Sequence, residues 1–280
     1  MGRRMTIDRE QMLGVARHER EGLGRTIQST DPAAWDRPSG SGDWRCRDVV
    51  AHLASTEVAA AAVLAGEAPT ELEEYLKSEE GANPTLDGFN RFAVERRAQV
   101  PFRQVILEWG RAADLFLGRA SLVTQGDWDG RRVPWVAGEI PLRYLVQSRI
   151  AEWWSHGEDI RAGADLEPRR EHWPMYAVND LAIRALPWAL GLAGLSYPGK
   201  SVLFELESGG GGTWHRGLGP REVPSEGKRP DATVAGRGYP FALVASRRVP
   251  AEEFLADGTL VVAGDEELAR AVLQHIRFFG

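Results

Sequence analysis

Apolar residues recur at helical spacing through most of the first 165 residues of the chain. This spacing predicts four helical regions: residues 6–29, the stretch that follows Asp43 as its N-cap, residues 86–122 with an interruption near Pro101, and the stretch that begins near Glu139 or Pro141. Residues 66–84 form a polar connection with a short helical piece at ELEEYLK, and residues 123–138 are expected to be a long turn. Four helices predict a bundle.

After Gly163 the pattern changes to short alternating runs between helical segments. The expected strands are SVLFELES (201–208), a run around TWHRG, ATVAG (232–236) and TLVVAG, and the expected helices are residues 171–192, YPFALVASRR and DEELARAVLQHIRFF. The glycine run 209–212 lacks the GK[ST] sequence of a phosphate-binding loop, so a hairpin turn is favoured. The fold class is therefore α+β. We expect a helical bundle over residues 1–165 and a small α+β domain over residues 166–280.

One face of the fourth predicted helix changes from apolar to ionisable partway along. Its members are three or four residues apart: Leu142, Leu145, Arg149, Glu152, His156 and Asp159. Glu152 and His156 are four residues apart, so on an α-helix both side chains leave the same face, one turn from each other. Because a solvated face is usually polar along its whole length, these polar groups interrupt a row that faces the core.

A carboxylate and an imidazole at this spacing provide half of a metal site. Zinc takes N and O donors at about 2.0–2.2 Å, and a catalytic zinc uses three protein ligands and leaves one position open. The best candidate for the third ligand is His52, on an apolar stripe of the second predicted helix. A histidine on such a stripe is more often a core residue, but the Glu152 and His156 pair favours ligation. The predicted set is His52, Glu152 and His156, which holds zinc or another divalent metal.

Composition and charge argue against certain kinds of binding partner and location. With 43% hydrophobic and 26% charged residues, the chain has the composition of a globular protein. The net charge of −6 and the lack of a basic stripe argue against nucleic acid. The opening MGRRM precedes no apolar signal segment and no run of 18 apolar residues occurs, so we expect neither a leader nor a membrane span. The single cysteine, Cys46, excludes an internal disulfide and predicts a reducing, cytoplasmic location.

Several further residues are candidates for supporting roles. Asp159 is placed to orient a metal-binding histidine and Arg149 to support Glu152, although Asp159 has Arg149 and Arg161 as alternative partners. Asn90 and Arg91 are candidates for a polar, substrate-binding pocket wall, and Arg91 has a solvated helix face as its alternative. Trp44, Trp153 and Trp154 lie beside the candidate ligands and would suit an aromatic pocket wall, or simply fill the core.

Two segments around the candidate ligands carry a resemblance to a known family. DWRCRDVVAHLAS matches W-x-x-x-D-x-x-x-H-L, and RIAEWWSHGEDI matches R-x-x-E-x-x-x-H-G-x-D-I. With these segments, the chain resembles the mycothiol-dependent maleylpyruvate isomerase family, whose N-terminal domain is a DinB-like metal-binding four-helix bundle. The C-terminal run from SVLFEL onward resembles the family's sterol-carrier-like domain.

The resemblance implies zinc at His52, Glu152 and His156 and a low-molecular-weight thiol, mycothiol or a similar compound, as cosubstrate. Binding to zinc would deprotonate the thiol and provide a nucleophile near neutral pH. The family's C-terminal arginine, which would hold an anionic substrate, has Arg247 or Arg248 as its counterpart, with Arg248 taken as the catalytic candidate and a surface pair as the alternative.

The predicted activity is cis–trans isomerisation or S-transfer on a small electrophile. A non-catalytic metal- or ligand-binding protein and a hydrolase using zinc-bound water remain alternatives. Neither the electrophile nor the choice between monomer and homodimer follows from the residues.

Overall fold

The computed structural model describes residues 7–219 and 227–279. The chain forms two compact units, one within Asp8–Arg169 and the other within Arg170–Gly280. The first is helical and the second combines a sheet with helices. The predicted α+β class is thereby confirmed.

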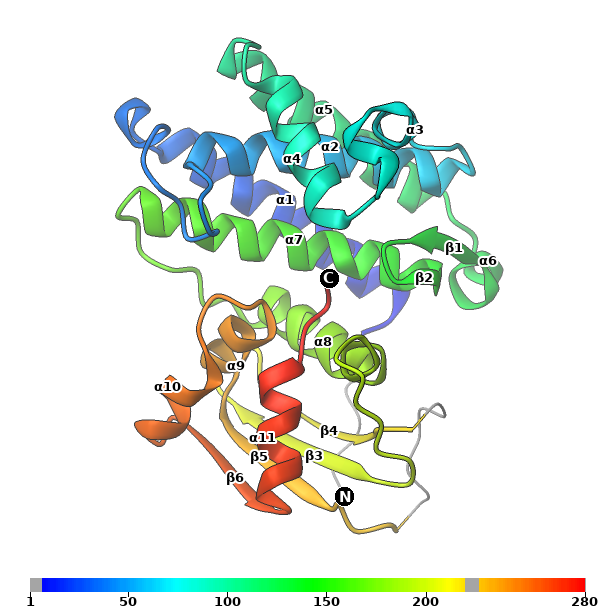
Figure 1. Ribbon diagram of the computed structural model, residues 1–280, viewed down its shortest axis with the longest axis vertical. Helices are drawn as coiled ribbons and strands as arrows, with labels where there is room; N and C mark the ends of the chain where they lie inside the picture. The colour runs from blue at the N-terminus through cyan, green and yellow to red at the C-terminus, as the bar shows by residue number, and fades with distance from the viewer. Residues whose placement is uncertain (1–6, 220–226, 280) are drawn as a thin grey trace. The chain divides into compact units, whose positions relative to one another are not determined.

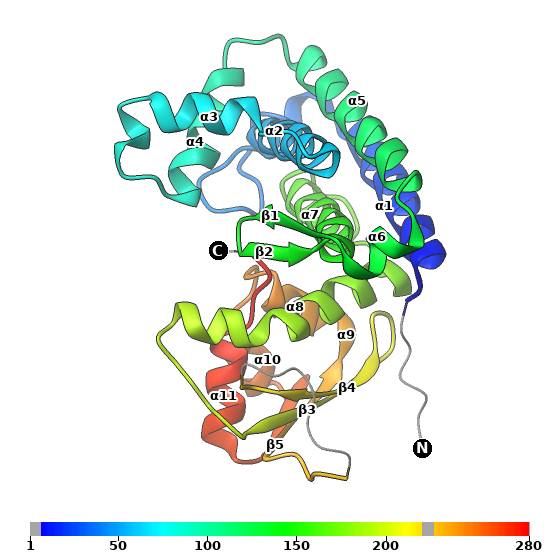
Figure 2. The ribbon, with the colours of Figure 1, turned by 90° about the vertical axis from the view of Figure 1, so that its right-hand side faces the viewer.

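Four long helices make up the bundle of the first unit: α1 (Arg9–Ser29), α2 (Cys46–Ala65), α5 (Phe102–Ser121) and α7 (Leu142–Gly163). Helix α2 packs against α5 and α7, and α1 packs against α5 and α7 (Figures 1 and 2). The shorter elements of this unit are η1 (Pro32–Ala34), α3 (Thr70–Lys77), η2 (Glu80–Ala82), α4 (Leu86–Arg97), α6 (Gln125–Gly130), β1 (Arg132–Trp135) and β2 (Gly138–Pro141). Helix α2 carries His52, and α7 carries Glu152 and His156.

The ends of these helices follow local capping chemistry, with one correction to the sequence-based expectation. Asp8 caps α1 in a capping box with Gln11. Helix α2 does not begin at Asp43, which is exposed. It begins after Arg45, whose backbone N–H donates to the Asp48 carboxylate at 3.0 Å. Because Asp48 meets the backbone from inside the first turn, no cap from Asp43 is needed.

The segment 123–138 is also ordered differently from the expected long turn. Thr124 caps the six-residue helix α6, where the Asp127 backbone N–H donates to the Thr124 hydroxyl at 3.1 Å, and Trp128 of α6 is buried. Strands β1 and β2 then pair antiparallel as a hairpin. Elements of four to six residues are too short to show a hydrophobic period, which is why the sequence pattern did not indicate them.

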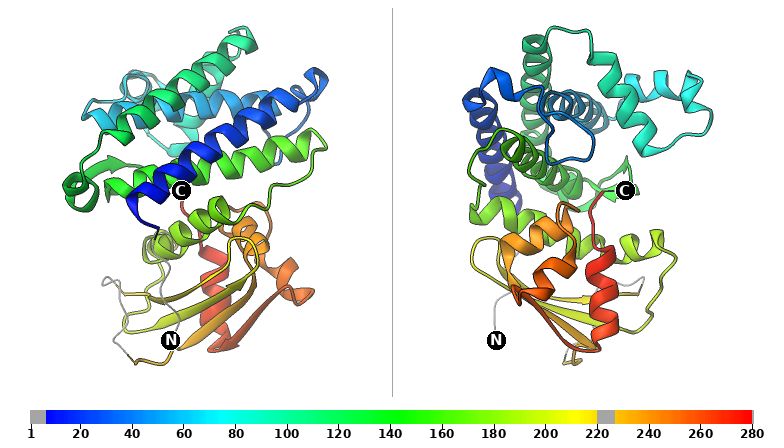
Figure 3. Two further views of the ribbon diagram at one scale, coloured as in Figure 1. Left: turned by 180° about the vertical axis from the view of Figure 1, so that it is seen from behind. Right: turned by 60° about the vertical axis from the view of Figure 1, so that its left-hand side comes forward.

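The second unit is built on a four-stranded mixed sheet with the strand order β4-β3-β5-β6 (Figure 3). Strand β3 pairs antiparallel with β4 and parallel with β5, and β5 pairs antiparallel with β6. Helix α8 packs against β4, α9 against β3 and β5, and α11 against β5 and β6. The bounds are α8 (His172–Leu192), β3 (Ser201–Glu207), β4 (Gly212–Gly217), β5 (Ala232–Arg237), α9 (Gly238–Ala245), α10 (Ala251–Ala256), β6 (Leu260–Gly264) and α11 (Glu266–His275). All these elements were expected except α10, which is short.

Helix α2 is long and apolar. By length and composition alone it would be able to cross a membrane, and it is the one helix in the described part of the chain that meets this test. In the structure, 72% of its most apolar stretch is buried inside the protein. Such burial is typical of a core helix, whose apolar side chains are covered by neighbouring helices.

Candidate metal centre

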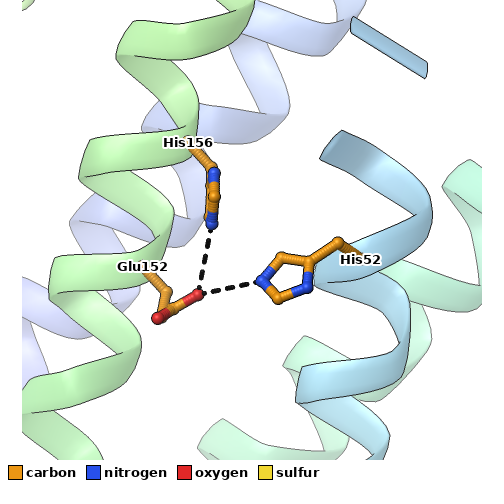
Figure 4. Close-up of side chains that lie close together, drawn as sticks. All are labelled: His52, Glu152 and His156. Carbon is orange, nitrogen blue, oxygen red and sulfur yellow. Dashed lines mark hydrogen bonds and ion pairs between the residues drawn. The ribbon is translucent and has the colours of Figure 1, made fainter. Parts of the chain in front are cut away.

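The three predicted ligands lie together between α2 and α7. His52 projects from α2, while Glu152 and His156 project one turn apart from α7, and the three side chains point toward one another (Figure 4). Glu152 Oε2 lies 3.3 Å from His52 Nε2 and 3.4 Å from His156 Nε2. One potential ligand atom from each residue lies within 4.8 Å of the other two.

This arrangement fits a divalent cation. In a tetrahedral site with bonds of about 2.1 Å, neighbouring ligand atoms are about 3.4 Å apart, which is close to the two separations between nitrogen and oxygen found here. Both histidines are only 6% exposed, and the Glu152 side chain is 12% exposed. Two imidazole nitrogens and one carboxylate oxygen, held in a largely buried place, could therefore bind a metal ion.

The charges of the three groups are strongly coupled. Burial alone would raise the pKa of Glu152, but its contacts with His156 and His52 and the nearby Arg149 charge hold that pKa well below its usual range. Burial lowers the pKa of His52, so this imidazole is neutral, as a metal ligand must be. Burial also acts to lower the pKa of His156, yet the hydrogen bonds with Asp159 and Glu152 outweigh it and raise the pKa. The raised pKa favours the protonated form of His156.

Asp159 contacts His156 as the sequence suggested. The Nδ1 of His156 and the Oδ2 of Asp159 are 2.8 Å apart, and Asp159 is 1% exposed. A carboxylate on Nδ1 fixes the tautomer that leaves Nε2 available toward Glu152. Arg161, the alternative partner in the sequence, donates to the Thr26 hydroxyl and to the Glu167 carbonyl, both at 2.7 Å.

Arg149 is engaged by a buried acid that the sequence analysis did not single out. Its Nη1 donates to Glu57 Oε1 at 3.2 Å, and the same oxygen accepts from Trp153 Nε1 at 2.8 Å. Glu57 is fully buried on α2, Arg149 is 1% exposed, and the guanidinium lies over the Trp135 ring at 5.0 Å. Arg149 therefore forms an ion pair with Glu57 and acts on Glu152 through its charge. In the sequence, Glu57 could have been noticed as the one acidic residue in the apolar stretch ASTEVAAAAVLA.

A pH dependence of stability follows from the burial of Glu57. Burial raises its pKa from 4.5 to about 7, against the opposing charge of Arg149. The folded state then binds more protons than the unfolded state between these values, so this group's contribution to stability is present below pH 4.5 and is lost as the pH rises through about 7. The free energy of unfolding of the wild type minus that of Glu57→Gln should fall by roughly 3 kcal/mol over this range. Urea titrations of both proteins measure this difference, and a flat difference would contradict the assignment.

The other candidate residues lie in varied surroundings. Asn90 and Arg91 lie on α4, where Asn90 is half-buried and Arg91 is exposed, and their substrate-binding role stays a prediction. Arg248 belongs to the second unit, follows α9, donates to the Ser246 carbonyl and lies over the Phe279 ring at 5.3 Å. Its catalytic role likewise stays a prediction. Its neighbour Arg247 is exposed.

Cys46 is buried at the start of α2, and its Sγ lies 3.9 Å from the Ile160 carbonyl oxygen. Burial raises the pKa of this thiol. The protonated thiol is a poor nucleophile, so Cys46 does not provide one near neutral pH.

The comparison with known families bears directly on this centre. Residues 16–161 match the mycothiol maleylpyruvate isomerase N-terminal domain, and this match covers more than half of the chain and includes all three candidate ligands. The chain belongs to this family. The resemblance found in the sequence is thereby confirmed.

Two solved structures share this fold over most of the chain, including the second unit. Two crystal structures of the mycothiol-dependent maleylpyruvate isomerase, one of them of a mutant, each give a TM-score of 0.60. They are 13% identical for the mutant and 14% for the other, and each alignment covers 92% of this chain and 96% of the solved chain. At this identity the likeness concerns the fold. No curated protein matches the chain.

Proposed function

We propose that this protein is a metal-dependent enzyme that uses a low-molecular-weight thiol, such as mycothiol, on a small electrophile. His52, Glu152 and His156 would hold the cation, with zinc as the first expectation. The reaction class is cis–trans isomerisation or S-transfer. In the first, the thiolate sulfur bonds to one carbon of an activated double bond, the remaining single bond rotates, and elimination restores the double bond and releases the thiolate. In the second, the new carbon–sulfur bond is kept: after addition, the neighbouring carbon takes up a proton from solvent, or, on an alkyl electrophile, the leaving group departs with the electron pair of its bond to carbon.

The observation that supports the proposal is the convergence of three buried donors from two helices. Three protein ligands leave room in the coordination shell of a tetrahedral cation, which is the arrangement of catalytic rather than structural zinc sites. When bound here, a divalent cation would lower the pKa of a coordinated thiol and so supply a nucleophile near neutral pH. Membership of the family links this centre with thiol chemistry.

The surrounding residues have defined tasks in this proposal. Asp159 holds the proton on Nδ1 of His156 and so presents Nε2 as the ligand atom. Glu152 provides one negative charge, which the nearby Arg149 charge helps to keep ionised. The second proton of His156 must leave before a cation binds, so metal affinity falls as the pH is lowered. A reducing, cytoplasmic compartment, in which the thiol stays reduced, is part of the proposal.

Turnover that requires both metal and thiol is the expected result of a direct assay. Protein loaded with Zn²⁺ and given mycothiol with maleylpyruvate should convert the cis to the trans isomer, and omission of either Zn²⁺ or thiol should remove the activity. Chromatographic separation of the isomers and of any thiol adduct distinguishes isomerisation from S-transfer. A panel of activated alkenes and alkyl electrophiles extends the test beyond maleylpyruvate.

Two other outcomes would replace the proposal. Hydrolysis of esters or amides without thiol would assign the centre to activation of water. Stoichiometric metal binding with no thiol-dependent turnover on any member of the panel would favour a non-catalytic binding protein.

A further inference from the structure

The two imidazoles of the metal centre are supported in different ways. His156 has Asp159 on its Nδ1. The Nδ1 of His52 is buried and has no hydrogen-bond partner among the residues that the structure describes. Histidines that bind metals almost always use their second ring nitrogen in a hydrogen bond that fixes the ring plane. His52 therefore requires a different constraint on its orientation.

The indole of Trp44 lies against both imidazoles. Its ring centroid lies 5.0 Å from that of His52, with 43° between the planes, and 6.4 Å from that of His156, with 31° between the planes. The two imidazoles are themselves edge to face, 4.9 Å apart and 68° inclined. Ring contacts at 4.5–7 Å are favourable, and the wide, rigid indole limits the tilt of the rings that it covers.

The backbone that carries Trp44 is fixed to α7, the helix of His156. Ser39 N–H donates to the Trp44 carbonyl at 2.8 Å, and Trp44 N–H donates to the Ser41 carbonyl at 3.1 Å, which closes the loop on itself. Gly40 N–H then donates to the Asp159 carbonyl at 3.0 Å. A Cβ on Gly40 would lie 3.1 Å from both Cα and Oδ1 of Asp159, so only glycine allows this approach without displacement. The loop thus meets the same aspartate that holds His156.

We propose that Trp44 is a positioning residue of the metal centre, which fixes the ring plane of His52 in place of the hydrogen bond that Nδ1 does not make. The proposal rests on the proposed function, since it takes His52 as a ligand. In this arrangement Asp159 serves both imidazoles: it holds His156 through its carboxylate and anchors the loop of Trp44 through its carbonyl. The loss of Trp44 would leave His52 free to rotate away from Glu152.

The test compares Trp44→Leu, Trp44→Phe and a matched control, Trp109→Leu, in the full chain. Trp109 is a buried indole on α5 that lies against Arg20 of α1. Zn²⁺ affinity, measured by competition with a chelator, should fall about 10- to 100-fold in Trp44→Leu and stay close to wild type in Trp44→Phe and Trp109→Leu. The visible absorption bands of bound Co²⁺, which report the arrangement of the ligands, should change in Trp44→Leu alone.

A second readout uses the metal-free protein. Nuclear Overhauser contacts between the ring protons of His52 and His156 report the edge-to-face arrangement directly. They should be present in the wild type, Trp44→Phe and Trp109→Leu, and be weakened or lost in Trp44→Leu. Circular dichroism checks that each variant keeps its helices. Because Trp44 is only half-buried and lies in a loop, its replacement leaves the bundle core intact.

The outcomes separate this inference from the proposed function. A wild type that binds no divalent cation would refute the proposed function, and the ring contacts would still decide whether Trp44 positions His52. Unchanged Zn²⁺ affinity in Trp44→Leu, with a wild type that binds Zn²⁺, would overturn the inference. An equal loss of Zn²⁺ affinity in Trp109→Leu would also overturn the inference, because it would show that the loss of an indole elsewhere in the bundle weakens metal binding by destabilising the protein.

Discussion

Replacement of His156 by alanine should reduce bound metal from about one ion per chain to almost none, while the bundle stays folded. Three protein ligands hold the cation in the proposed site, and the loss of one leaves two donors with the affinity of an ordinary surface pair. The fold should persist because the apolar core of α1, α2, α5 and α7 does not depend on this side chain. Elemental analysis after dialysis, together with circular dichroism, measures both quantities.

The matched control for this experiment is His18→Ala. His18 is exposed on α1 and lies outside the candidate centre, so its removal should leave the metal content unchanged. Equal metal content in wild type and His156→Ala would show that the ligand assignment is wrong. Loss of metal in both variants would point to adventitious binding at surface histidines.

The second large effect is a loss of stability when the buried ion pair of Glu57 and Arg149 is broken. Glu57→Ala should lower the free energy of unfolding by about 3–5 kcal/mol, because it leaves the Arg149 guanidinium buried without its ion-pair partner. It also removes the acceptor of the Trp153 N–H. Urea unfolding followed by circular dichroism gives the change. Glu57→Gln retains an oxygen at this position and should cost less.

An exposed ion pair provides the comparison for Glu57→Ala. Glu67 lies 3.5 Å from Arg119, and its side chain is 62% exposed. Because water solvates both charges, Glu67→Ala should change the free energy of unfolding by less than about 1 kcal/mol. A change of that size in Glu57→Ala as well would mean that Arg149 finds another partner or water when Glu57 is absent.

The helices and the shared face of Glu152 and His156 could be predicted because each depends on a periodic pattern. Glu152 and His156 share a face by their spacing alone, and His52 lies on the core-facing stripe of its own helix. The structure places all three side chains within reach of one cation. That α2 and α7 are neighbours is a tertiary fact which helix periodicity does not contain. The resemblance to a known family supplied it.

The features that the sequence analysis did not predict depend on contacts between residues that no local sequence pattern indicates. Glu57 was visible only as a single acid in an apolar stretch, and its partner Arg149 lies 92 residues further along the chain. The start of α2 was misplaced because Asp43 and Asp48 are both suitable acids, and only the backbone geometry at Arg45 decides between them. Roles for Asn90, Arg91 and Arg248 depend on a bound substrate and stay predictions.

The candidate ligands are divided between helices that are far apart in the chain, since Glu152 lies 100 positions after His52. During synthesis, the segment that ends at α5 can form helices but has only one of the three donors. A cation captured at this stage would have one imidazole and would exchange rapidly. The three donors come together only when α7 joins the bundle, so metal loading of the proposed site would be a late event that marks a completed N-terminal unit.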